Sequence, residues 1–147
     1  MNKKGVTLLE LIIVMVIIGI GAVLLAPSIG NWLTIYRLKG TTRDVVSTLR
    51  TAQIKAVSSN LEYRVSFANQ TFLLQRGNLS SNSTTWTDEG SAQTLPSGIT
   101  MSGSLNNGSA EFNPNSTCTG GNLILTNTKG TTRTIRLTSA TGRINVE

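Results

Sequence analysis

The chain has 147 residues, of which 13 are basic and 7 are acidic, so its formal net charge is +6 in the absence of histidine. A chain of this length can hold one modest domain and a short anchor. Without histidine it cannot form a Ser-His-Asp triad or the common zinc sites, and its single cysteine, Cys118, excludes an intrachain disulfide and a multi-cysteine metal site. We therefore predict neither an enzyme nor a metal or cofactor site.

A long apolar segment dominates the N-terminal end of the sequence. The stretch KKGVTLLELIIVMVIIGIGAVLLAP, residues 3–27, has two lysines at its start and one acid, Glu10, and no charged residue occurs between Glu10 and Arg37. About 20 apolar residues in a helix cross the hydrocarbon layer of a membrane. A cleaved secretory signal would have a shorter apolar core and a small-residue cleavage site. A plain signal anchor would fit the positions of Lys3 and Lys4 on the cytoplasmic side. It leaves Glu10 unexplained, because a carboxylate inside the bilayer costs a few kcal/mol.

A third interpretation explains the acid. The same stretch resembles the class III leader and N-terminal helix of type IV pilins and type II secretion pseudopilins. The resemblance implies that prepilin peptidase cleaves between Gly5 and Val6, that Val6 is then N-methylated, and that Glu10 becomes the fifth residue of the mature chain. Val6 stands where the family more often has phenylalanine or methionine. The implied organisation is a leader at residues 1–5, a transmembrane and filament-core helix at 6–30, and a periplasmic pilin-like domain at 31–147.

Two residues of this segment have predicted roles in assembly. A cationic amine at Val6 and the Glu10 carboxylate of a neighbouring subunit can neutralise each other in an apolar filament core, where an unpaired charge is costly. Glu10 would then penalise a subunit that docks at the wrong height; the alternative is that it lies in the headgroup zone of a signal anchor. Pro27 lacks an amide hydrogen, so it is predicted to kink or locally unwind the helix. The alternative is that the helix ends near Pro27.

The remaining sequence predicts the second half of the helix and an antiparallel sheet. From about residue 31 to residue 59, apolar residues recur at helical spacing and predict a stripe that packs on the sheet: Leu38, Val45, Leu49, Ala52 and Ala56. Alternating patterns and turn residues then predict strands near residues 63–67, 71–75, 99–101, 110–112, 122–127, 131–139 and 142–146. Residues 76–98 are predicted to form a long polar loop that contains Trp86. The predicted fold class is α+β and pilin-like, with one long N-terminal helix packed on a C-terminal antiparallel sheet.

Three further stretches resemble the GspH/FimT group of minor pilins and pseudopilins: LRTAQIKAVSSNLEYRVSF, FNPNSTCTGGNLILTN and IRLTSATGRINV. The sequence departs from that group at Gln53 and Ile54, where arginine and a small polar residue are common. It also lacks the cysteine pair that closes a C-terminal loop in many major pilins, which favours a minor subunit or a pseudopilin.

Two function classes follow. The first is a structural subunit, anchored in the bacterial inner membrane with a cytoplasmic N-terminus and then built into a pilus or pseudopilus. Its implied partners are other pilins or pseudopilins, prepilin peptidase and the inner-membrane assembly platform. The second is a DNA-binding minor pilin for natural transformation, with phosphate contacts from four basic residues: Lys129, Arg133, Arg136 and Arg143. The FimT side of the group is associated with a G-R-x-R pattern, whereas here Gly142 and Arg143 are followed by Ile144 and Asn145. The structural role is therefore the favoured prediction.

Overall fold

The structure is a computed structural model that describes residues 5–68 and 70–147, without the side chains of residues 24–29 and 31. Contacts divide the chain into two compact units, Met1–Leu33 and Thr34–Glu147. Helix α1, Leu8–Ser59, contributes its first residues to one unit and its last residues to the other. Each unit is described below by itself.

The first unit consists of the start of α1 and the few residues before it. Thr7 caps the helix, because its hydroxyl accepts the N–H of Glu10 and its carbonyl accepts the N–H of Leu11, each at 3.2 Å. Thr7 and Glu10 thus have the spacing of a capping box. The backbone is helical without a break at Pro27, so the alternative in which the helix ends there is wrong. The side chain of Pro27 lies outside the described residues, and the kink stays a prediction.

The apolar side chains of this unit are exposed. Every residue from Leu11 to Ile18 is about half exposed or more, from 49% for Val14 to 64% for Ile17. Over the side chains that the structure describes, no helix combines the length and the apolarity needed to cross a membrane. The predicted leader at residues 1–5, including Lys3 and Lys4, lies outside the described residues except for Gly5.

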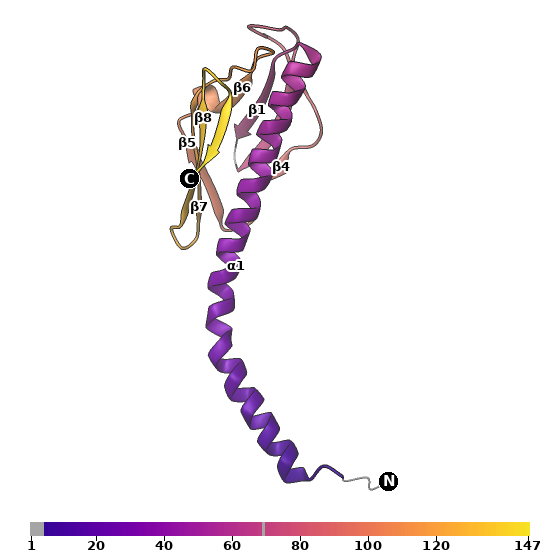
Figure 1. The fold of residues 1–147 in the computed structure, drawn as a ribbon, viewed down its shortest axis with the longest axis vertical. Helices are drawn as coiled ribbons and strands as arrows, with labels where there is room; N and C mark the ends of the chain where they lie inside the picture. The colour runs from indigo at the N-terminus through magenta and orange to yellow at the C-terminus, as the bar shows by residue number, and fades with distance from the viewer. Residues whose placement is uncertain (1–4, 69) are drawn as a thin grey trace. The chain divides into compact units, whose positions relative to one another are not determined.

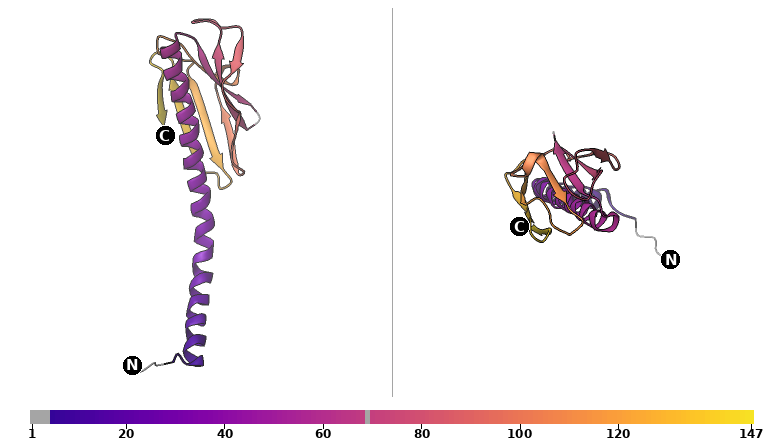
Figure 2. Two further views of the ribbon diagram at one scale, coloured as in Figure 1. Left: turned by 90° about the vertical axis from the view of Figure 1, so that its right-hand side faces the viewer. Right: turned by 90° about the horizontal axis from the view of Figure 1, so that it is seen from above.

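In the second unit, strands gather around the last part of α1 (Figure 1; Figure 2). The predicted apolar stripe is confirmed, since each of its five members is at most 1% exposed. Two threonines beside the stripe, Thr41 and Thr42, are also buried, and their hydroxyls donate to the carbonyls of Arg37 and Leu38 within the helix. Their buried oxygens are therefore satisfied, and the helix can pack tightly on the strands.

The strands form two antiparallel sheets. The first has the order β3-β2-β1-β6, with β4 also paired to β2. Its strands are β1 Tyr63–Ala68, β2 Thr71–Gly77, β3 Trp86–Asp88, β4 Gln93–Thr94 and β6 Ser109–Phe112. The second has the order β5-β7-β8-β9. Its strands are β5 Ile99–Gly103, β7 Gly121–Asn127, β8 Thr132–Thr138 and β9 Arg143–Val146, and a single 3-10 turn, η1 Asn106–Gly108, precedes β6. The predicted α+β class is confirmed, although the strands split into two sheets where one was expected.

The core lies between the helix stripe and the inward faces of both sheets. Phe112 of β6, Leu125 of β7 and Ile135 of β8 are fully buried there, together with Leu38 and Leu49 of α1. Phe112 also forms an isolated bridge with Cys118, in the segment between β6 and β7. Since apolar burial is the main stabilising term in folding, this shared core holds both sheets on one helix.

The prediction of one long loop at residues 76–98 is wrong. These residues include the end of β2 and the short strands β3 and β4, which pair with β2. Trp86 lies with its ring centroid 4.2 Å from the guanidinium carbon of Arg64, and Asp88 accepts a 2.7 Å hydrogen bond from Gln75. β3 and β4 have only three and two residues, so they show no alternation of apolar and polar residues that could predict them. Pairing with β2 and exposed side-chain contacts hold them in place.

The segment between β2 and β3 is held by a buried carboxylate. Glu62 is 7% exposed, and its two oxygens accept the backbone N–H groups of Asn82 at 2.9 Å and Ser83 at 2.6 Å. A buried carboxylate is stable only when its oxygens find such donors. Glu62 therefore fixes the base of this segment beside the end of α1.

Candidate functional site

The predicted cleavage site lies in an open segment before the helix. Gly5, Val6 and Thr7 belong to no helix or strand, and the Val6 side chain is 72% exposed. A Cβ atom added to Gly5 would have no heavy atom within 4 Å. The peptide bond between Gly5 and Val6 is therefore not covered by the described part of the chain.

Glu10 lies in the first turn of α1 and is exposed. Its carboxylate is favoured there by the positive end of the helix dipole, which is a structural role that needs no second subunit. Among the ion pairs formed by the described residues, none involves Glu10. The carboxylate is thus placed where it can stabilise its own helix.

The four basic residues predicted to contact DNA do not share one surface. Ile135 and Leu137 of β8 are buried, so the alternating side chain of Arg136 points to the opposite, outer face. Arg136 is opposite Asn145 in the β8–β9 register, and Thr138 is opposite Arg143. Arg136 and Arg143 are therefore diagonal neighbours on the outer face.

The charge of this arginine pair is partly countered. The Nε atom of Arg136 lies 3.9 Å from a carboxylate oxygen of Glu147, and both side chains are more than half exposed. Such a pair contributes little free energy in water. Asn145, at the place of the second arginine of the G-R-x-R pattern, lies on the same face directly opposite Arg136.

The other two basic residues lie elsewhere. Lys129 is in the turn between β7 and β8, where the side-chain oxygen of Asn127 accepts the N–H groups of Lys129 at 3.0 Å and Thr131 at 2.9 Å. Arg133 is on the inward-facing side of β8, in phase with Ile135 and Leu137. There it lines a groove against the helix.

This cationic groove has a volume of about 680 Å³ and lies between α1 and the end of the second sheet. Its lining includes four cations and three apolar residues: Lys39, Arg43, Arg50, Arg133, Val46, Ile54 and Val146. Three of the cations come from the helix, at positions outside the predicted apolar stripe. Their spacing was the available signal, because positions 39, 43, 46, 50 and 54 lie along one face of a helix.

The turn before Arg143 is held against the helix. Gly142 has a φ of +61°, and its carbonyl accepts a 3.2 Å hydrogen bond from the Gln53 amide. A Cβ atom at Gly142 would lie 2.2 Å from the carbonyl oxygen of Ser116. The residue therefore has to be glycine for this turn to pack, and Gln53, one of the two departures from the GspH/FimT pattern, helps to fix the start of β9.

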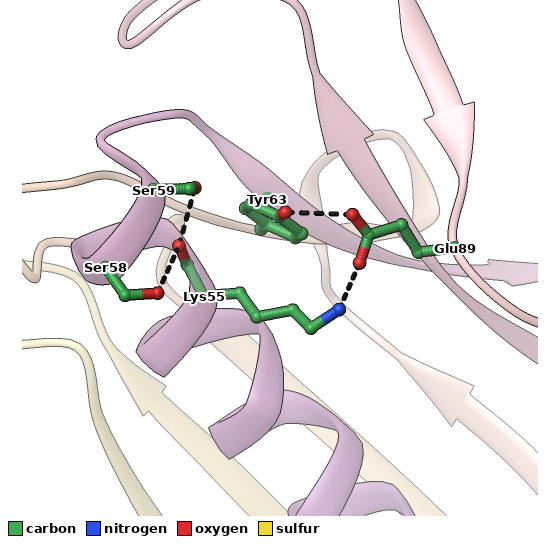
Figure 3. A network of polar contacts seen from close by, with 5 residues as sticks. All are labelled: Lys55, Ser58, Ser59, Tyr63 and Glu89. Carbon is green, nitrogen blue, oxygen red and sulfur yellow. Dashed lines mark hydrogen bonds and ion pairs between the residues drawn. The ribbon is translucent and has the colours of Figure 1, made fainter.

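A second polar cluster ties the end of α1 to the first sheet (Figure 3). Lys55 forms an ion pair with Glu89, and the Tyr63 hydroxyl donates to the same carboxylate at 2.9 Å. The hydrogen bond from Lys55 lowers the pKa of Glu89, and the same bond raises the pKa of Lys55. Burial, followed by the Glu89 contact, raises the pKa of Tyr63.

These shifts keep the Lys55 and Glu89 charges fixed at neutral pH. A catalytic acid or base needs the opposite, a pKa moved toward neutrality. We therefore interpret the cluster as a structural clamp. The remaining reactive group, Cys118, is buried, its thiol lies 3.4 Å from the Thr138 carbonyl oxygen, and burial raises its pKa, so the thiolate is disfavoured. Among the described residues, no group of three or more His, Cys, Asp or Glu residues could hold a metal ion.

Comparison with known proteins gives two findings. Residues 1–26 match the prokaryotic N-terminal methylation motif. The fold is similar to that of the minor pseudopilin EpsH from the type 2 secretion system of Vibrio cholerae, with a TM-score of 0.63 and 10% sequence identity over 76% of this chain and 96% of that chain. No curated protein matches the sequence.

Proposed function

We propose that this chain, which has the N-terminal methylation motif and the fold of the type IV pilin and pseudopilin superfamily, is a minor structural subunit of a type IV pilus or a type II secretion pseudopilus. In this proposal prepilin peptidase cleaves between Gly5 and Val6 and Val6 is methylated. The apolar part of α1 then anchors the chain in the inner membrane until the assembly platform inserts it into a filament.

The apolar surface at the start of α1 carries the proposal. Consecutive residues from Leu11 to Ile18 are exposed, so apolar side chains cover all sides of the helix rather than one stripe. A helix that is apolar all round is stable only when lipid or other helices cover it. A pilin subunit meets both conditions in turn, lipid before assembly and neighbouring helices afterwards.

The processing step gives the direct test. Intact-mass measurement of the chain extracted from membranes should show loss of residues 1–5 and the added mass of one methyl group. A Gly5→Leu variant should keep its leader, because the proposed peptidase site is lost while the apolar segment is unchanged. A mature chain that begins beyond residue 20 would instead indicate an ordinary signal peptide and would contradict the proposal.

DNA binding is the second candidate function. The observation that favours it is the pair Arg136 and Arg143, which are neighbours on the outer face of β8 and β9. Two arginines can make two phosphate contacts, which give weak and salt-sensitive affinity. The Glu147 carboxylate beside Arg136 and the absence of a second arginine at Asn145 both reduce that affinity.

A further inference from the structure

The cationic groove has features that neither proposed function uses. Among the described residues that line it, none is acidic, while Lys39, Arg43, Arg50 and Arg133 all contribute positive charge. Two acids adjoin lining residues along the chain: Asp44, which follows Arg43 but does not line the groove, and Glu147, whose side chain is in phase with Arg136 on the outer face of the sheet. The groove therefore favours an anionic occupant.

One wall of the groove is a free strand edge. β9 is the last strand of its sheet, and Val146 lines the groove. The backbone groups of Glu147 and Thr134 bond to each other in both directions, at 2.8 Å and 3.0 Å. Because such pairs alternate along an antiparallel ladder, the N–H and C=O groups of Ile144 and Val146 point away from β8. They form an edge on which another extended chain can pair.

The dimensions and the apolar floor fit an extended peptide. From Lys39 to Ile54 the helix rises about 22 Å at ~1.5 Å per residue, which is the length of roughly seven residues in a strand at ~3.3 Å each. Val46, Ile54 and Val146 provide apolar surface between the cations. In a strand, alternate side chains point the same way, so acidic residues two apart would face the helix cations together.

We infer that the cationic groove binds an extended acidic segment of another protein, which adds to β9 as a strand and places its carboxylates against Arg43, Arg50 and Arg133. A second copy of this chain fits poorly, because its net charge is +6 and two of its few acids, Glu62 and Glu89, are already bound to internal partners. Single-stranded nucleic acid also fits less well, because binding of that kind relies on aromatic stacking and no aromatic residue is among those that line the groove. The inference does not depend on cleavage at Gly5 or on filament assembly.

The test uses the full chain in an uncharged detergent and a fluorescent eight-residue peptide of alternating glutamate and valine. Fluorescence anisotropy should show binding that weakens at least tenfold when glutamine replaces every glutamate of the peptide. The double variant Arg43→Gln/Arg50→Gln should weaken binding roughly tenfold, because an exposed ion pair contributes up to about fivefold. The matched control Arg37→Gln/Arg76→Gln removes the same charge from residues that do not line the groove, and it should change binding less than twofold.

Strand pairing is tested with two peptides that are N-methylated on alternate residues. Only one of the two phases should abolish binding, because only one phase blocks the N–H groups that face β9. Equal losses in the groove variant and the control would mean that bulk charge attracts the peptide, and equal tolerance of both methylation phases would exclude strand addition. An oligo-dT strand that binds more tightly than the peptide and is lost in the groove variant would assign the groove to nucleic acid instead. Each of these results would overturn the inference.

Discussion

Single residues fix the contacts between the helix and the last hairpin. Gly142 is the clearest case, because both its backbone conformation and the space around it exclude a side chain. Its φ of +61° is strained for any residue with a Cβ, and that atom would overlap the Ser116 carbonyl oxygen. The Gln53 amide, which bonds to the Gly142 carbonyl, would also be displaced.

Gly142→Ala should therefore lower the free energy of unfolding by about 2–4 kcal/mol, the sum of backbone strain and a forced shift of the turn. Chemical denaturation of the full chain in detergent, followed by tryptophan fluorescence, measures this change. Gly130→Ala is the matched control, because Gly130 has a φ of +78° and open space around the position of a Cβ. It should cost only about 1–2 kcal/mol. Equal losses in the two variants would show that packing at Gly142 is unimportant.

The clamp formed by Lys55 and Glu89 should make stability depend on pH in a defined direction. Lys55 lowers the pKa of Glu89 below its usual value of 4.5, so the stabilisation is present above that value. It is lost as the pH falls through the lower, folded-state pKa of Glu89. Since Lys55 is 43% exposed, we expect a contribution of no more than about 1 kcal/mol.

Glu89→Gln should reduce the denaturation midpoint at pH 7 and should have a smaller effect at a pH below the lowered pKa of Glu89, where the carboxyl group is protonated. A double-mutant cycle with Lys55→Met isolates the ion pair from the hydrogen bond to Tyr63. Asp88→Gln is a useful comparison, because it removes a neighbouring charge that contacts Gln75 rather than Lys55. A Glu89→Gln effect of the same size at both pH values would contradict the assignment of the clamp.

At the scale of elements, the periodicity of apolar residues predicted the helix and the strands, but it did not predict which strands pair with one another. The helix stripe from Leu38 to Ala56 follows a 3.6-residue period, and every predicted member is buried. The alternation of Tyr63, Val65 and Phe67 likewise predicted β1 and its hairpin with β2. Alternation does not tell which strands lie side by side, so the division into two sheets could not be predicted from it.

The cationic groove could not be predicted from the sequence either, because it forms between elements that only the tertiary structure brings together. In the sequence, its cations on α1 resemble an ordinary solvent-exposed helix face. Arg133 and Arg136 are close in sequence and suggest one basic cluster, whereas in β8 they lie on opposite faces of the sheet. Strand alternation could have warned that positions 133 and 136 differ in parity and point to opposite faces. The placement of the β9 edge beside one side of the helix is a tertiary arrangement and leaves no local pattern in the sequence.

The separation of the arginines leads to a smaller salt dependence than four clustered cations would give. If DNA binds the outer face of β8 and β9, only Arg136 and Arg143 contact phosphates, and the slope of log K against log salt should be near −1.8, about −0.9 for each contact. A titration of the full chain with duplex DNA at several salt concentrations measures this slope. Arg136→Gln/Arg143→Gln should abolish the dependence, whereas Lys39→Gln should leave it unchanged. A slope that is steeper by about two would indicate that Arg133 and Lys129 also contribute.

At the scale of the whole molecule, the proposed role of the start of α1 in assembly can be tested at Glu10. The Glu10 carboxylate lies at the positive end of its own helix dipole, and a second, separable role is proposed for it toward the amine of a neighbouring subunit. Removing the carboxylate makes membrane insertion easier, because the segment loses its only acid. The loss of one partner of a buried ion pair costs about 3–5 kcal/mol.

Glu10→Ala should therefore insert normally and enter sheared filaments at least roughly tenfold less well, measured by immunoblotting in a strain without the wild-type copy. Thr7→Ala is the matched control, because it removes the cap at a cost of about 1 kcal/mol and keeps the charge. It should lower incorporation much less than Glu10→Ala does. If both variants lower incorporation equally, Glu10 acts through its own helix and the pairing proposal is wrong.

The buried Glu62 has a consequence for how this fold can diversify. It holds the segment after β2 through main-chain N–H groups, so it does not recognise the side chains that the segment carries. Proline is disfavoured at positions 82 and 83, because their N–H groups are donors, and the φ of +55° at Asn82 favours asparagine, aspartate or glycine there. Asn78 and Ser83 also bond to the backbone of the segment through their side chains, whereas the Ser80 side chain forms no hydrogen bond among the described residues. Related chains can therefore change the surface of this segment over evolutionary time while the same carboxylate keeps its base in place.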